Sequence, residues 1–139
     1  MKRMVMVLTV GALFLALAAG VALATDYYGN PYAETIHGSN GDDVIRGAGG
    51  GDFLSGGFGN DRLYGGAGDD GLYGNVGNDT LTGGNGSDRI VGGSGNDTVY
   101  SVGDDSTDFV DCGPGYDVAN RQRGPGANDT FVNCEKFIY

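Results

Sequence analysis

The chain has 139 residues, including 29 glycines, and its 18 acidic residues outnumber 8 basic ones, for a formal net charge of −10 at pH 7. Such an acidic surface argues against nucleic acid as a partner, because phosphates require Lys and Arg, and it favours cations. High charge combined with so much glycine is also typical of disordered chains, so an ordered fold needs support from a sequence pattern.

The first 24 residues have the features of a secretory signal peptide. A basic head precedes an apolar run over residues 4–19, and an Ala-x-Ala cleavage motif ends at Ala24. Cleavage there leaves 6 basic residues against 18 acidic ones. The alternative is an uncleaved anchor, because residues 5–24 are just long enough to span a bilayer. We expect a secreted, extracellular protein with no membrane insertion after cleavage.

Residues 38–100 parse without a gap into seven nonapeptides of the pattern Gly-x-x-Gly-x-Asp-x-aliphatic-x. Position 2 departs from glycine at Ser39, Ala48 and Asn75. The aliphatic residues of position 8 are Ile45, Leu54, Leu63, Leu72, Leu81, Ile90 and Val99. The aspartates of position 6 are Asp43, Asp52, Asp61, Asp70, Asp79, Asp88 and Asp97. A disordered chain has no reason to keep such a period, so the pattern predicts a repeat fold.

The segments on either side follow the period less regularly. Residues 25–37 are predicted to be an N-terminal cap containing one degenerate repeat, with Glu34 at the aspartate position. Residues 101–139 are predicted to be degenerate repeats and a C-terminal cap, with Asp108, Asp117 and Asp129 at that position. The first of these repeats is two residues too long. Degenerate ends are typical of stacked repeats, whose terminal faces have no neighbour.

The period predicts an all-β, two-sheet solenoid with 18 residues per coil. Positions 7 to 9 are expected to form a short strand with only position 8 pointing inward, and positions 1 to 6 a turn. Repeats then stack on the next but one. The aspartates would form two columns, and the aliphatic residues would face each other across a core one side chain deep.

Stacked aspartates need a counter-charge. Neighbouring strands lie about 4.8 Å apart, and two carboxylates at roughly 5 Å repel by about 3 kcal/mol at an effective dielectric constant of about 20. A divalent cation between each pair reverses the sign of this interaction. Carboxylate and carbonyl oxygens in a flexible turn suit Ca²⁺ better than Mg²⁺ or Zn²⁺. The seven regular repeats predict about five ions, and the degenerate repeats could add a few.

The pattern resembles the calcium-binding nonapeptide repeats of RTX (hemolysin-type) proteins, strongly over residues 38–100 and with degenerate ends over residues 29–131. The resemblance implies a parallel β-roll that folds when Ca²⁺ binds between successive coils. It implies side-chain ligands at position 6, including Asp108 and Asp117, and carbonyl ligands in the turns, such as those of Gly41, Gly57, Gly59 and Gly66. RTX toxins and proteases usually carry a C-terminal export signal, whereas this chain has an N-terminal one.

The two cysteines, Cys112 and Cys134, fit an oxidising destination and are expected to form a disulfide. A bridge closing a loop of this length stabilises by roughly 3 kcal/mol. Two cysteines without a nearby histidine are too few ligands for zinc. The bridge would link the last coils and cover an exposed sheet edge.

No catalytic constellation is recognisable. His37 is the only histidine, the cysteines are expected to be oxidised, and the regular carboxylates are assigned to ions, so we do not expect an enzyme. The leading hypothesis is a secreted calcium-binding scaffold. The alternatives are a calcium-dependent adhesion module for a cell-surface or matrix polymer, favoured by Phe53, Phe58 and Tyr64, and a stand-alone relative of the β-roll of a secreted toxin or protease.

Overall fold

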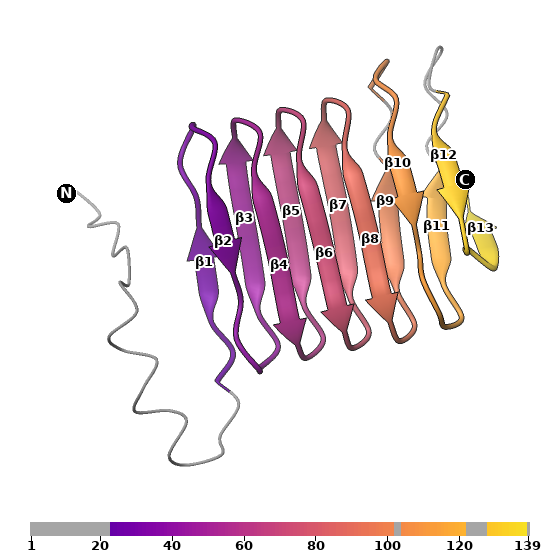
Figure 1. Cartoon of the computed structure of the whole chain (residues 1–139), viewed down its shortest axis with the longest axis horizontal. Helices are drawn as coiled ribbons and strands as arrows, with labels where there is room; N and C mark the ends of the chain where they lie inside the picture. Colours follow the sequence, from indigo (N-terminus) through magenta and orange to yellow (C-terminus); the bar gives the residue numbers. More distant parts are fainter. Residues whose placement is uncertain (1–22, 102–103, 122–127, 139) are drawn as a thin grey trace.

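In a computed structural model the chain forms coils that stack side by side into a flattened solenoid (Figure 1). The structure describes residues 23–101, 104–121 and 128–138. All but the last two residues of the predicted signal peptide, residues 1–24, therefore lie outside the described residues. Within the described part of the chain, no helix is long and apolar enough to cross a membrane.

The solenoid has two sheets, and in each sheet every pair of neighbouring strands is parallel. The seven-stranded sheet has the order β1 (Asp26–Tyr28), β3 (Val44–Gly49), β5 (Arg62–Ala67), β7 (Thr80–Asn85), β9 (Thr98–Ser101), β11 (Val118–Arg121) and β13 (Lys136–Ile138). The six-stranded sheet has the order β12 (Thr130–Val132), β10 (Phe109–Asp111), β8 (Arg89–Ser94), β6 (Gly71–Val76), β4 (Phe53–Phe58) and β2 (Thr35–His37).

Each strand pairs with the strand two further along the chain, so one coil consists of two strands and two turns. The register confirms the predicted 18-residue coil: Leu54 lies beside Leu72, and Leu63 beside Leu81. Where the turns are longer the strands still pair in line, because Ile90 lies beside Val110, an offset of 20 residues. The predicted two-sheet parallel solenoid is therefore confirmed.

The strands of the regular repeats are longer than predicted. β4 continues beyond Leu54 and Ser55 through Gly56 and Gly57 to Phe58, the first three positions of the next repeat. Within the predicted strand, positions 7 to 9, only position 8 is buried, as expected, and the continuation of the strand adds a second buried position, Gly56. Glycine at position 1 has no side chain, so it leaves no apolar signal in the sequence pattern. Its extended backbone nevertheless continues the strand, and the residue lies inside the solenoid.

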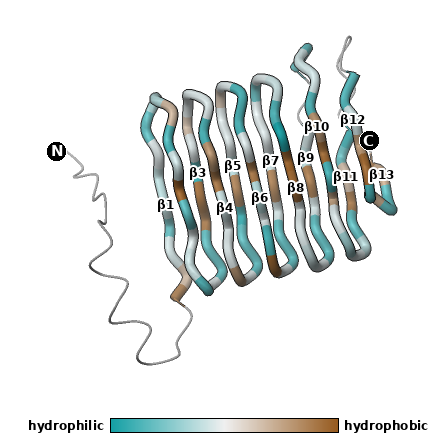
Figure 2. The backbone as a smooth tube through the Cα atoms, viewed as in Figure 1, coloured by the Kyte–Doolittle hydropathy of each residue, from teal (hydrophilic) through white to brown (hydrophobic). Residues whose placement is uncertain are grey.

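The core is a single row of apolar side chains from each sheet. Its buried members are Ile45, Leu54, Leu63, Leu72, Leu81, Ile90, Val99, Val110, Cys112 and Ala119. Figure 2 shows this row as a hydrophobic band across the middle of the strands, with mostly neutral to hydrophilic colours in the turns at both edges. A core this thin buries little apolar surface. The fold therefore needs additional stabilisation, which has to come from the turns.

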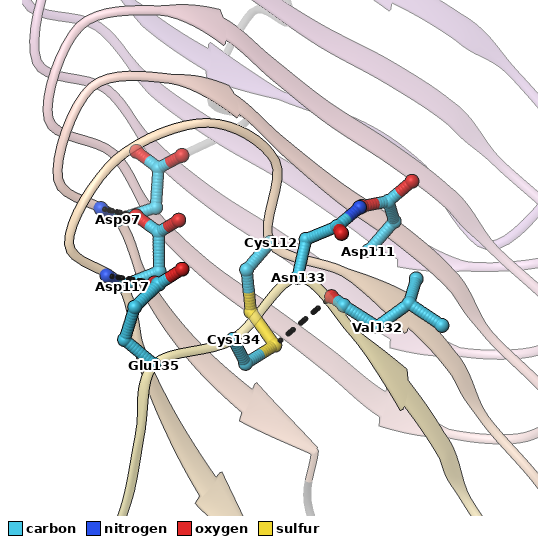
Figure 3. Close-up of a disulfide and its surroundings, with 8 residues drawn as sticks. All are labelled: Asp97, Asp111, Cys112, Asp117, Val132, Asn133, Cys134 and Glu135. Atoms are coloured by element: carbon cyan, nitrogen blue, oxygen red, sulfur yellow. Dashed lines mark hydrogen bonds between the residues drawn. A yellow bond between two sulfur atoms is a disulfide. The ribbon is translucent and has the colours of Figure 1, made fainter.

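The predicted disulfide is present between Cys112 and Cys134, with an S–S distance of 1.99 Å (Figure 3). The two cysteines follow β10 and β12, which are neighbours in the six-stranded sheet. Cys112 is fully buried, and its N–H donates to the Val132 carbonyl. Asn133 donates to Asp111 beside the bridge, at 2.8 Å. The bridge thus links the last two coils of this sheet.

Loss of the bridge is expected to weaken folding without abolishing it. Cys112→Ser removes a cross-link worth about 3 kcal/mol and leaves a hydroxyl in the core. The measurement is the calcium concentration at the midpoint of folding, followed by circular dichroism, and we expect it to rise. Cys134→Ser, at a less buried position, separates loss of the bridge from burial of the hydroxyl. Unchanged midpoints in both variants would rule out a stabilising role for the bridge.

Candidate metal centre in two carboxylate ladders

Two rows of acidic side chains run along the two edges of the solenoid where strands give way to turns. In each row the backbone N–H of one residue donates to a carboxylate oxygen of the residue one coil further on, at 2.7–2.9 Å. We call these rows the odd ladder (Asp43, Asp61, Asp79, Asp97, Asp117 and Glu135) and the even ladder (Glu34, Asp52, Asp70, Asp88, Asp108 and Asp129).

The ladders bring the predicted side-chain ligands together in the two expected columns. The nine predicted aspartates, from Asp43 to Asp117, are only 0–3% exposed. Their Oδ1 atoms accept the N–H of the preceding coil. In seven of them the other oxygen, Oδ2, is buried without any hydrogen-bond partner: Asp52, Asp61, Asp70, Asp79, Asp88, Asp97 and Asp117. A buried carboxylate oxygen without a partner is costly, so these atoms mark where a cation would fit.

Glycine at position 1 makes room for these oxygens. A Cβ on Gly56 would stand 2.8 Å from the Gly74 carbonyl oxygen and 2.9 Å from the Asp61 carboxyl carbon. The missing side chain therefore leaves a space bordered by a carboxylate of one coil and a carbonyl of the next. The described residues contain no group of three or more His, Cys, Asp or Glu side chains that could hold a metal. A cation at this edge would therefore need backbone carbonyls as well.

The ladder carboxyls are destabilised as anions in the middle of the solenoid. Burial raises the pKa of Asp79 and Asp88 from 3.8 to about 7, and that of Asp61, Asp70 and Asp97 to about 6. The backbone N–H bonds lower these pKa values, and neighbouring ladder carboxylates raise them further. In the metal-free fold these carboxyls therefore keep their protons up to about pH 6–7, and a divalent cation would replace those protons.

Of the predicted carbonyl ligands, Gly41 and Gly59 lie in turns, whereas Gly57 and Gly66 lie within β4 and β5, contrary to the expectation that all four are turn residues. The carbonyl oxygens of Gly41, Gly59 and Gly66 lie against the stacked glycine of the next coil, where a Cβ would clash. Gly57 has φ = 113° and lies beside Asn75 of the next coil. Coordination of an ion by these four carbonyls remains a prediction.

Sequence reasoning missed two groups of potential ligands. Glu135 ends the odd ladder, with Oε2 accepting the Asp117 N–H at 2.8 Å (Figure 3). Glu135 lies 18 residues after Asp117, the spacing of a regular coil, so counting one coil on from Asp117 could have found it. The second group is the carbonyls of position 1, such as those of Gly74 and Gly83, which border the spaces beside the buried Oδ2 atoms. The recurrence of glycine at position 1 is the sequence signal that could have indicated these carbonyls.

The departures at position 2 have different consequences. Ala48 and Asn75 adopt φ of 84° and 78°, as the glycines of this position do. The turn geometry thus persists there at some cost in strain. Ser39 instead donates its N–H to Asp43 Oδ2 at 2.5 Å and places its Oγ 2.9 Å from the same atom. Thr25 donates its N–H to the other oxygen of Asp43, so hydrogen bonds close this end of the odd ladder.

Comparison with protein families gives a match to the RTX calcium-binding nonapeptide repeat (4 copies). The match recurs over residues 28–63, 46–81, 64–99, 73–108 and 82–119, which together cover two thirds of the chain. It includes most of both ladders and ends before Asp129 and Glu135. Neither the curated proteins nor the solved structures contain a significant match.

The role of position 1 can be tested by adding one methyl group. In Gly65→Ala the Cβ would stand 2.5 Å from the Gly83 carbonyl oxygen and 3.0 Å from the Asp70 carboxyl carbon. We expect a destabilisation of about 1–3 kcal/mol, measured as a higher calcium midpoint of folding. Gly71→Ala is the matched control, because its Cβ meets no atom closer than 3.5 Å. Equal midpoints for the two variants would contradict the steric role of Gly65.

The raised pKa values of the ladder predict an unusual pH dependence. A carboxyl whose pKa is raised in the folded state binds more protons when folded than when unfolded. The metal-free fold should be most stable below about pH 4 and lose stability as the pH rises to about 7, the pKa of Asp79 and Asp88. Circular dichroism in chelator should therefore show β-structure increasing on acidification.

The double variant Asp79→Asn, Asp88→Asn serves as the control, because an amide imitates the protonated acid and should reduce this dependence. A metal-free stability that stays constant or increases between pH 4 and 7 would contradict the prediction.

Proposed function

Because the chain belongs to the family of the RTX calcium-binding nonapeptide repeat, we propose that it is a secreted, non-catalytic scaffold that folds when calcium ions bind between its stacked turns. The observation that carries this proposal is the set of seven buried aspartates whose Oδ2 has no partner. The side chains that would hold the ions are those of the two ladders, together with turn carbonyls.

The electrostatics of the ladders support a folding role for the ions. Two carboxylates one coil apart repel by about 3 kcal/mol at an effective dielectric constant of about 20. Burial of one Leu side chain contributes about 1.5–3 kcal/mol. Since each regular coil buries only one aliphatic residue of position 8 per sheet, the core has little excess with which to offset the ladders. Calcium bound between the carboxylates supplies the missing positive charge.

The nature of the oxygens supports calcium over other divalent cations. The ladders offer carboxylates and carbonyls in turns without a rigid octahedral arrangement, which suits the 6–8 oxygen ligands of Ca²⁺. Sulfur ligands are absent from the ladders, and the chain's two cysteines are joined in a disulfide. The regular repeats predict about five ions. Each ladder contains five successive carboxylate pairs, so the degenerate coils could add further ions.

Secretion is supported by the disulfide, which persists in oxidising compartments, and by the signal-like sequence of residues 1–24. A non-catalytic role is supported by the family match, which contains RTX repeats and no catalytic family. The acidic ladders are already committed to cations in this proposal. They therefore leave no activated nucleophile or unassigned acid–base pair along the solenoid edges.

A second candidate function is a calcium-dependent module that binds a cell-surface or matrix polymer. The outer face of the six-stranded sheet carries a row of His37, Phe53 and Tyr73, with ring centroids 5.9 and 4.9 Å apart. On the opposite face, Arg46 lies between the rings of Tyr28 and Tyr64, at 5.2 and 5.1 Å. Rigid aromatic rows of this kind suit sugar rings. Polysaccharide binding that disappears in chelator would support this candidate, and its absence would exclude it.

The proposed function predicts that calcium itself induces the fold. The purified protein should give a coil spectrum by far-ultraviolet circular dichroism in chelator, and a β spectrum on cooperative titration with Ca²⁺ in the micromolar to millimolar range. Mg²⁺ is the control ion, because it requires stricter octahedral geometry and should not produce the transition. A β spectrum that chelator leaves unchanged would refute calcium-dependent folding.

A further inference from the structure

The last space of the even ladder differs from the other spaces between ladder residues. Ser101 is buried, and its Oγ lies 2.8 Å from Oδ2 of both Asp108 and Asp129. The Oδ2 atom of Asp108 therefore has a hydrogen-bond donor. In the preceding coils of this ladder, the Oδ2 atoms of Asp70 and Asp88 have none.

Ser101 is followed by a longer turn than the glycine of the preceding coil, although Cys112 occupies position 1 with the regular spacing to Asp117. Ser101 occupies position 1, where the preceding coil of this edge has Gly83. A Cβ on Gly83 would stand 2.9 Å from the Asp88 carboxyl carbon, so that coil cannot hold a side chain there. Asp88 lies five positions after Gly83 along the chain, whereas Asp108 lies seven positions after Ser101. The two additional residues and the serine thus occur together.

The last space of the odd ladder provides a direct comparison within the same molecule. Asp117 and Glu135 border it (Figure 3). In the same way, Asp108 and Asp129 border the last space of the even ladder. In both, a buried aspartate is followed by a more exposed acid. Asp117 Oδ2 has no partner, whereas Asp108 Oδ2 has the Ser101 hydroxyl. The two spaces therefore differ in whether a hydroxyl reaches the buried oxygen.

We infer that Ser101 closes the last space of the even ladder by hydrogen bonding, so that this space holds no calcium ion, whereas the last space of the odd ladder holds one. The inference rests on the proposed function. A donor to the buried Asp108 oxygen removes the cost that a cation offsets elsewhere. One hydroxyl has a single proton, which serves Asp108, while Asp129 is half-buried and can be hydrated.

The consequence is that calcium binding along the even ladder ends at Asp108. Beyond it, the last coil of the six-stranded sheet is held by the Ser101 hydroxyl and by the Cys112–Cys134 disulfide. This sheet would therefore retain its C-terminal coil contact at calcium concentrations at which the ion-dependent spaces begin to empty.

The test counts bound ions in matched variants of the full chain. Native mass spectrometry resolves individual Ca²⁺ ions, and the samples are compared at the lowest calcium concentration that saturates the wild type. Glu135→Gln and Asp129→Asn each neutralise the terminal acid of one ladder while keeping an oxygen that can accept the backbone N–H. We expect Glu135→Gln to bind one ion fewer than the wild type and Asp129→Asn to bind the same number.

Loss of an ion in Asp129→Asn would overturn the inference. Glu135→Gln that binds as many ions as the wild type would also overturn it, because buried carboxylate oxygens without a donor would then not mark ion sites. Ser101→Ala provides a second measurement and should bind at least as many ions as the wild type, since Asp108 Oδ2 loses its donor. A lower count in Ser101→Ala would mean that the serine oxygen is a calcium ligand and would also overturn the inference. A wild type that binds no calcium would instead refute the proposed function.

Discussion

The fold depends on one repeated contact, in which the backbone N–H of a buried acid donates to the carboxylate of the acid one coil further on. This bond fixes the spacing of successive coils and aligns the turns along both edges. Only one of the two carboxylate oxygens accepts this hydrogen bond. The second oxygen remains buried without a donor in seven aspartates, so the contact that orders the coils also creates the need for a cation. Structure and ion binding are therefore two consequences of the same hydrogen bond.

The remaining features of the coil follow from accommodating these carboxylates. Position 1 lacks a side chain because the carboxylate and a carbonyl of the next coil occupy the space that a Cβ would need. Because position 1 has no side chain, each strand contributes only one aliphatic residue to the core. A fold with such a core gains little from apolar burial, so the ladders contribute a large share of what holds the coils together once their charge is neutralised. The outer faces of both sheets remain available for aromatic rows such as that of Phe53 and Tyr73.

At two ladder ends, hydrogen bonds from the chain itself reach carboxylate oxygens that have no donor in the middle coils. Ser39 and the Thr25 N–H satisfy Asp43 at the first end of the odd ladder. Ser101 reaches Asp108 near the last end of the even ladder, and the disulfide links the adjacent coils. Terminal coils have a stacking neighbour on one side only. Donors supplied by the chain itself do not depend on the calcium concentration and suit these positions.

The sequence by itself determined the period of the coil, the two columns of aspartates and the aliphatic core row, because each depends on a fixed interval along the chain. It also determined the cysteine pairing, because the chain has only two cysteines. Only the tertiary structure decided features that depend on contacts between coils. The strands continue through position 1 because parallel pairing extends beyond the last apolar side chain. The structure also shows that the chain returns to the odd ladder at Glu135, one regular 18-residue coil after Asp117, although only two residues separate it from β12. Ser101 reaches two carboxylates 7 and 28 residues away, a contact that no local spacing encodes.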